Sequence, residues 1–181
     1  MQVFTALLAI GAGALAVLVL AGRFVRGRSA LVDELLDAVD DAALWLAFLV
    51  AAASTLGSLY FSEVADYVPC RLCWFQRIAM YPLAVILLVA AIRRDRAVRW
   101  YAIPLAGLGA SVSIYHYLVE WHPRLEGDVC DPTNPCSLVW FREFGFVTLA
   151  LMALCGFVAI IALLLPTRRR ELDDESDRLV T

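Results

Sequence analysis

Four cysteines fall in two closely spaced pairs whose chemistry would be disulfide exchange. Cys70 and Cys73 form a C-x-x-C motif, and five residues separate Cys130 from Cys136. Because a thiolate attacks a disulfide, two such pairs brought together could pass a disulfide from one to the other. The sequence leaves open whether these cysteines rest as two local disulfides or as one bridge between loops. Cys155 belongs to no motif and is interpreted as an inert buried thiol.

Two further ionisable residues could tune this chemistry. Pro69 precedes the C-x-x-C motif and an apolar stretch follows it, which predicts a helix N-terminus, where free N–H groups stabilise a thiolate. Arg77 comes four residues after Cys73, one helical turn along the same face. His116 is expected at a similar depth in another apolar segment. We interpret Arg77 and His116 as contacts for the oxygens of a ligand. The alternatives are an arginine that reaches lipid phosphate and a histidine that is hydrogen-bonded packing.

The composition predicts that these residues lie in a membrane protein. Of 181 residues, 62% are hydrophobic and 18% charged, whereas a soluble domain is near half apolar and a quarter charged. Five apolar segments approach the length of about 20 residues that crosses the bilayer: about 3–21, 42–62, 74–92, 100–119 and 144–165. The expected fold class is all-α, a polytopic membrane protein. No basic stripe with interleaved aromatic residues is present, so nucleic-acid binding is not expected.

The expected organisation has four parts. Residues 1–21 form an extra N-terminal transmembrane helix, and residues 42–165 form a four-helix transmembrane bundle. Residues 22–41 carry five carboxylates and are interpreted as a cytoplasmic connector or an interfacial helix. Residues 166–181 are interpreted as a disordered acidic cytoplasmic tail. The first segment could instead be a cleaved signal peptide, although it lacks a basic start.

The arginines predict the orientation, since arginine near span ends is retained in the cytoplasm. If the spans alternate, eleven of the 15 arginines fall on one side and four on the other. We therefore expect a multi-pass protein of the cell membrane with its N-terminus outside and its C-terminus in the cytoplasm. Both cysteine pairs then lie on the extracytoplasmic side, where disulfides persist.

The run CRLCWFQR at residues 70–77 resembles the C-x-x-C-x-x-x-R signature of the DsbB family, membrane enzymes that oxidise thiols at the expense of quinone. The second cysteine pair and the following WFREFGFVTLALMAL resemble the family's second loop and last core helix, so the resemblance covers about residues 42–165. The spacing of Cys130 and Cys136 is similar to that of compact, Gram-positive-type members. The extra N-terminal helix lies outside the family's four-helix core.

The resemblance implies a quinone-dependent protein-disulfide oxidoreductase. It would reoxidise an extracytoplasmic, thioredoxin-fold DsbA-like protein at its outer cysteine pair and pass the electrons to a membrane quinone of the ubiquinone or menaquinone type. Cys73 would be the donor to the quinone. The implied catalytic residues are Cys70, Cys73, Cys130 and Cys136. The implied quinone-binding residues are Arg77 and His116, and no metal is expected.

Three alternatives use the same cysteines differently. The first is a vitamin K epoxide reductase-like enzyme, although its redox motif belongs near the end of the bundle. The second is a membrane subunit with structural disulfides only. The third is a zinc site built from four thiolates, which is typical of reducing compartments.

Overall fold

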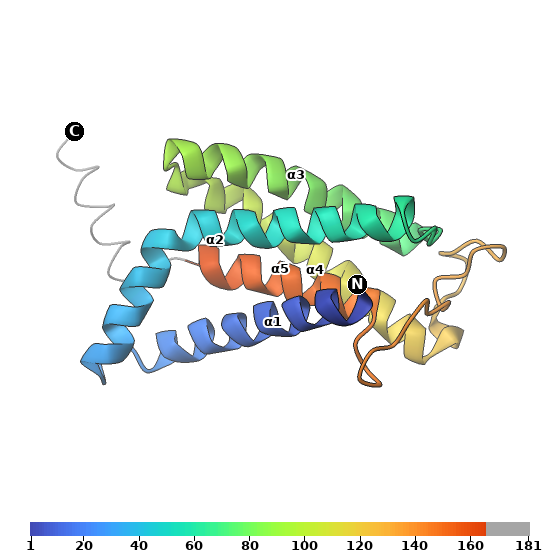
Figure 1. The fold of residues 1–181 in the computed structure, drawn as a ribbon, viewed down its shortest axis with the longest axis horizontal. Coiled ribbons are helices and arrows are strands. Elements are labelled where there is room, and N and C mark those ends of the chain that lie inside the picture. Colours follow the sequence, from blue (N-terminus) through green and yellow to red (C-terminus); the bar gives the residue numbers. More distant parts are fainter. Residues whose placement is uncertain (166–181) are drawn as a thin grey trace.

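The computed structural model describes residues 1–165, and its ordered elements are helices (Figure 1). The bounds are α1 Gln2–Phe24, α2 Ala30–Glu63, α3 Arg71–Arg93, α4 Arg99–Trp121 and α5 Leu149–Leu164, with short 3-10 turns at η1 Arg96–Val98 and η2 Pro123–Leu125. Within residues 1–165 there is no strand, only two isolated β-bridges in the loop before α5. The predicted all-α fold class is confirmed. The predicted tail, residues 166–181, lies outside the described residues.

Four helical stretches are long and apolar enough to cross a membrane: Gln2–Phe24, Ala30–Glu63, Arg71–Arg93 and Arg96–Trp121. The fifth, α5, has 16 residues and is about 24 Å long, shorter than the roughly 30 Å of hydrocarbon. It begins five residues later than the apolar segment suggested. Phe144 and Gly145 have positive φ values of 52° and 82° and make a turn, and the Thr148 side chain then caps the helix by accepting from the Leu151 N–H.

The helix is not broken at residue 41, where the sequence placed a boundary. Helix α2 continues from the acidic segment into the span. Figure 1 shows the first part of α2 inclined steeply to the rest. Asp40 of α2 is buried and accepts hydrogen bonds from Arg23 at 2.9 Å and Arg26 at 3.4 Å. The acidic residues therefore hold the end of α1, a pairing that helical periodicity alone does not indicate.

The core of the bundle lies between α2, α3, α4 and α5 and contains small residues that allow close helix packing. Gly109 of α4 is the clearest case, because a Cβ atom there would lie 2.3 Å from the ring of Phe157. Phe157 is fully buried as a result. The largest buried apolar side chains of this core are Leu83, Leu87, Phe157 and Ile160. This packing holds α3, which carries the first cysteine pair, in a defined position.

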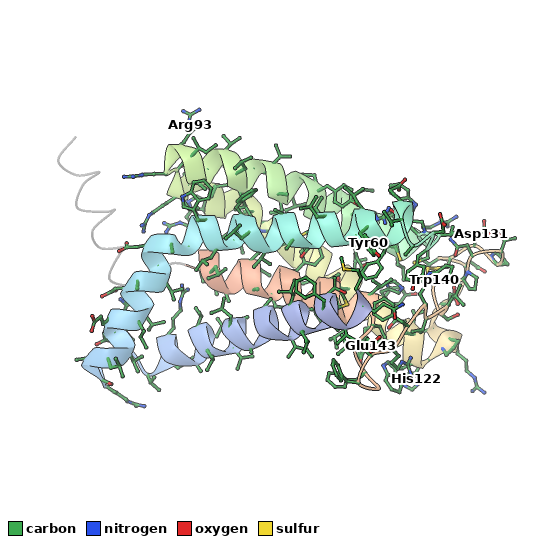
Figure 2. The ribbon with its side chains drawn as sticks, in the orientation of Figure 1. Tyr60, Arg93, His122, Asp131, Trp140 and Glu143 are labelled. Carbon is green, nitrogen blue, oxygen red and sulfur yellow. A yellow bond between two sulfur atoms is a disulfide. The ribbon has the colours of Figure 1, made fainter. Side chains whose placement is uncertain are left out.

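The two ends of the bundle carry different segments of the chain. In Figure 2 the labelled loop residues Asp131, Trp140 and Glu143 lie at one end, and Arg93 lies at the other. Helix α1 begins at the loop end, where Gln2 donates to the Tyr67 hydroxyl at 2.6 Å. The cysteine loops and the start of the chain thus share one end, opposite the arginine-rich joint between α3 and α4.

Candidate redox site

The first cysteine pair lies at the N-terminus of α3. Cys70 caps the helix, and its sulfur accepts a hydrogen bond from the Cys73 N–H at 3.2 Å. The sulfur atoms of Cys70 and Cys73 are 2.7 Å apart. The two sulfurs are therefore neighbours that can be joined in a disulfide when the pair is oxidised. The predicted helix N-terminus at the C-x-x-C motif is confirmed.

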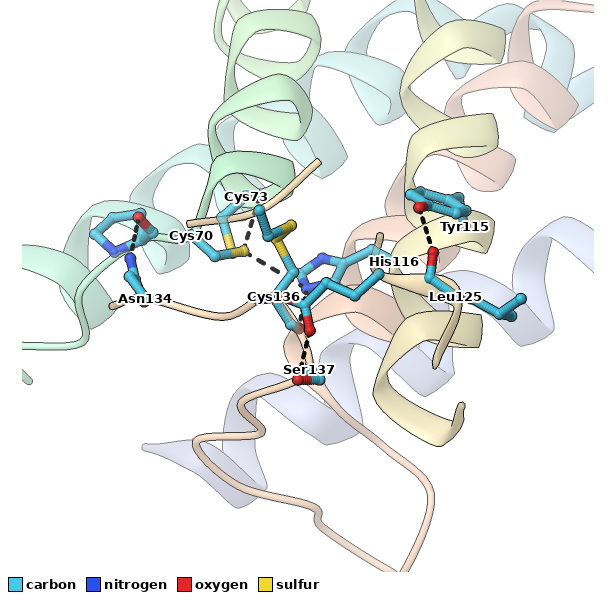
Figure 3. Close-up of a disulfide and its surroundings, with 11 residues drawn as sticks. Cys70, Cys73, Tyr115, His116, Leu125, Asn134, Cys136 and Ser137 are labelled. Carbon is cyan, nitrogen blue, oxygen red and sulfur yellow. Dashed lines mark hydrogen bonds between the residues drawn. A yellow bond between two sulfur atoms is a disulfide. The ribbon is translucent and has the colours of Figure 1, made fainter. Parts of the chain in front are cut away.

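His116 connects the two cysteine pairs (Figure 3). Its Nε2 atom lies 3.7 Å from the sulfur of Cys70 and 3.2 Å from the carbonyl oxygen of Cys136. Because a carbonyl oxygen only accepts, Nε2 carries the hydrogen in that bond. The imidazole is 3% exposed, so this N–H acts in a site shielded from water. His116 can therefore stabilise a negative sulfur at Cys70 while it holds the loop that carries Cys136.

The electrostatics at Cys70 favour the thiolate. A hydrogen bond from the Cys73 thiol, with a smaller contribution from the His116 imidazole, lowers the pKa of Cys70 to about 5 against the opposing effect of burial. A low pKa makes a cysteine a good leaving group in disulfide exchange. The chemistry suited to Cys70 is therefore release from a mixed disulfide.

The second pair is a disulfide between Cys130 and Cys136, whose Cα atoms are 5.8 Å apart. The Glu126 carboxylate accepts hydrogen bonds from the Cys136 N–H and the Ser137 hydroxyl, and the Asn134 amide donates to the Pro69 carbonyl at 3.1 Å. The Asn134 bond docks the loop onto the start of α3, while the Glu126 bonds connect two parts of the loop itself. As a result one buried cluster contains three cysteines with two apolar neighbours: Cys70, Leu72, Val119, Cys130 and Cys136.

Arg77 is fixed against α2 rather than directed to lipid. Its Nε and one terminal N–H group donate to the hydroxyl and carbonyl oxygens of Ser58, both at 3.0 Å. The guanidinium also lies over the Trp74 ring, 5.3 Å from its centroid. Its remaining N–H groups have no acceptor within residues 1–165 and are available to a ligand. This geometry counts against the alternative in which Arg77 reaches a lipid phosphate.

A cavity of about 540 Å³ adjoins Cys73 and Arg77. Cys73 and Arg77 are on its wall, and most of the rest of the lining is apolar and comes from α1, α2, α3, α5 and Trp140. His116 is not on this wall; with Cys70, Cys73 and Glu120 it lines a small neighbouring pocket, so Cys73 borders both spaces. Arg77 thus lines the cavity and His116 the small pocket, with Cys73 bordering both, whereas the sequence predicted both residues around one ligand.

Two site residues were missed from the sequence. Ser58, which orients Arg77, lies 19 residues away on another helix and carries no local signal. Glu120 is buried one helical turn after His116, and a carboxylate at that spacing within an apolar segment could have been noticed. In the described part of the chain, Glu120 Oε2 and His116 Nδ1 lack hydrogen-bond partners.

A metal could meet three ligand atoms, from Cys70, Cys73 and His116, which lie within 4.8 Å of one another. The four-thiolate zinc site considered above would require the Cys130–Cys136 bond to break. The arrangement instead suits thiol–disulfide exchange, because one pair is oxidised while the other lies beside it as free cysteines.

A helical membrane bundle with two adjoining cysteine pairs at one end is an arrangement suited to disulfide exchange in a membrane. Residues 40–165 match the family model described as disulfide bond formation protein DsbB, so the chain belongs to the DsbB family. The predicted family is confirmed, and membrane disulfide oxidation follows from it. The assignment does not favour the vitamin K epoxide reductase-like alternative.

Named relatives agree with the family. The chain is 44% identical over 119 residues to disulfide bond formation protein C of Bacillus subtilis, covering 65% of this chain and 86% of that protein. It is 41% identical over 146 residues to a probable disulfide formation protein of Deinococcus radiodurans, covering 75% and 95%. A probable disulfide formation protein of Coxiella burnetii is 44% identical over 113 residues, covering 61% and 77%. No solved structure matches the chain.

Proposed function

We propose that this protein reoxidises an extracytoplasmic, thioredoxin-fold DsbA-like protein and transfers the electrons to a membrane quinone. The observation that carries the proposal is the position of the first cysteine pair between two environments. Cys70 shares a buried cluster with Cys130 and Cys136, while Cys73 lies on the wall of the apolar cavity. Two electrons received by the Cys130–Cys136 pair can therefore reach the interior of the bundle by disulfide exchange with the neighbouring Cys70–Cys73 pair.

The first exchange takes place at the Cys130–Cys136 disulfide. A thiolate of the reduced partner attacks one sulfur, and the other leaves as a thiolate. The partner's second thiol then resolves the mixed disulfide. The partner gains a disulfide, and Cys130 and Cys136 hold the two electrons as thiols. Cys130 is 8% exposed and Cys136 is fully buried, which favours Cys130 as the sulfur that meets the partner.

The second exchange passes the electrons inward. The Cys136 thiolate attacks Cys70 of an oxidised Cys70–Cys73 pair, and Cys73 leaves as a thiolate. Cys130 then attacks Cys136, which re-forms the outer disulfide and releases Cys70. The His116 N–H, 3.7 Å from Cys70, stabilises the released thiolate. The cycle conserves two electrons, which now rest on Cys70 and Cys73.

The cavity beside Cys73 fits a quinone. Its volume is in the range of about 300–1,000 Å³ that accommodates organic ligands, and its mostly apolar lining includes a few polar side chains, among them Gln76 and Arg77. Cys73 and Arg77 would hold the ring there, with the unpaired N–H groups of Arg77 directed to a quinone oxygen. When bound, a quinone accepts two electrons and two protons from the Cys70–Cys73 dithiol, whose sulfurs become a disulfide again. Ser58 keeps the guanidinium in position through its two hydrogen bonds.

The direct test is oxidation of a reduced thioredoxin-fold protein by the purified protein in lipid nanodiscs, with and without added quinone. We expect oxidation to require quinone and to stop in Cys73→Ser. Cys155→Ala, which removes a thiol outside both pairs, should oxidise its partner at the wild-type rate. Unchanged oxidation by Cys73→Ser, or equal rates with and without quinone, would refute the proposal.

A further inference from the structure

Helix α1 forms one wall of the cavity although it lies outside the residues that match the DsbB family. The family match begins at residue 40, and α1 ends at Phe24. Even so, the cavity is lined from α1 by a run of apolar and small residues: Leu7, Leu8, Gly11, Ala12 and Leu15. Helix α2 adds Leu49, Val50, Ala53 and Gly57 to the lining, and α3 and α5 contribute the rest of the helical lining. The extra helix therefore adds a lining that the four-helix core lacks.

The packing of α1 explains why a cavity remains beside it. Along its length α1 packs mainly on α5, where Ala16 meets Ala159 and Ala162, and it contacts α2 much less. Its two ends are nevertheless tied to α2 and the segment that follows it, through Gln2–Tyr67 and Arg23–Asp40. Helix α1 is thus held at both ends and along one side, and the space between its middle and α2 stays open.

Two glycines, one on α1 and one on α2, line this open space. A Cβ atom at Gly11 of α1 or at Gly57 of α2 would have no other atom within 4 Å. The space is continuous with the end that carries Cys73 and Arg77, because all four residues line one cavity. A ligand whose polar ring lies at Cys73 would therefore extend its apolar part between Gly11 and Gly57.

We propose that α1 and the facing part of α2 bind the isoprenoid tail of the quinone. The inference rests on the proposed function and adds α1, which lies outside the family match, to the residues of α2, α3 and α5 that line the cavity. Lipid chains are as apolar as the tail, so the gain does not come from transfer out of water. It comes from van der Waals packing in the part of the cavity between α1 and α2, which we call the slot, and from exclusion of lipid chains from this slot. Holding the tail also keeps the ring at Cys73.

The test fills the slot without disturbing the protein's own packing. Gly11→Leu and Gly57→Leu place a side chain in the open space from either wall, and leucine is a better helix former than glycine. Gly107→Leu is the matched control, because Gly107 lies in α4, has the same open surroundings and does not line the cavity. Dissociation constants are measured in nanodiscs for a long-tailed quinone and a short-chain analogue by quenching of tryptophan fluorescence. Thermal unfolding confirms that each variant is folded.

The expected result is selective for the tail. Gly11→Leu and Gly57→Leu should raise the ratio of the long-tailed to the short-chain dissociation constant by about tenfold, which corresponds to 1.4 kcal/mol. Gly107→Leu should keep the wild-type ratio. A wild-type ratio in both cavity variants would overturn the tail site and leave the proposed function standing. Equal affinity of the wild type for the two quinones would overturn it in favour of a lipid chain in the slot. Absence of quinone binding to the wild type would overturn the proposed function itself.

Discussion

The role of His116 leads to a quantitative prediction about Cys70. His116→Phe keeps a ring of similar size but removes the N–H that lies 3.7 Å from the Cys70 sulfur. A hydrogen bond to a charged group contributes about 1.5–3 kcal/mol. Since 1.36 kcal/mol corresponds to one pKa unit, the pKa of Cys70 should rise by about 1 to 2. It should stay below the ordinary value, because the Cys73 thiol, the larger cause of the lowered pKa, is still present.

The measurement is the pH dependence of Cys70 alkylation, identified by peptide mass spectrometry, with the Cys130–Cys136 disulfide intact. Because the pKa of Cys70 is lowered to about 5, the wild-type thiolate should persist at neutral pH and be lost only as the pH falls through that value. In His116→Phe the profile should move to higher pH. His116→Gln, whose amide can still donate, should recover part of the difference, and His122→Phe, at an exposed histidine, should behave as wild type. An unchanged profile in His116→Phe would show that the imidazole does not stabilise the thiolate.

Three further predictions concern the ligand, the packing and the topology. Arg77→Met should weaken quinone binding by roughly ten- to a hundredfold, the value of one charge-assisted hydrogen bond, as measured by titration in nanodiscs; unchanged affinity would remove Arg77 from the site. Gly109→Ala should lower the free energy of unfolding by about 1–3 kcal/mol, because its Cβ meets the Phe157 ring at 2.3 Å, whereas Gly107→Ala should not; equal melting temperatures would contradict this packing. After reduction, a membrane-impermeant thiol reagent added to intact cells should label Cys130, the more exposed cysteine of the outer pair; labelling only after lysis would reverse the proposed orientation.

The local features of the site could be predicted from the sequence because they depend on neighbours in the chain. Pro69 and the apolar run after the C-x-x-C motif place a helix start at Cys70, and the four-residue spacing places Arg77 on the face of Cys73. The apolar segments identified the helices for a similar reason, since crossing a bilayer imposes length and hydropathy on each segment by itself. The start of α5 was placed too early because Phe144 is apolar but adopts a positive φ in a turn.

The contacts of His116 could not be predicted from local features of the sequence. Its distance along the span predicted a depth similar to that of Arg77, but depth does not determine which neighbour a helix face meets. That neighbour depends on how α3, α4 and the loop before α5 pack, and this packing brings His116 to Cys70 and Cys136 and not to Arg77. Ser58 and Asp40 are similar cases, because their arginine partners lie on other helices.

The sequence by itself determined the class of protein, the helices and the residues able to exchange disulfides, because residue type, spacing and hydropathy are local properties. Only the tertiary structure decided that the cysteine pairs share one cluster, that Cys73 borders an apolar cavity and that α1 forms a wall of it. The physical reason is that side chains of separate helices meet only where close packing of the bundle places them. Function here depends on those contacts between helices.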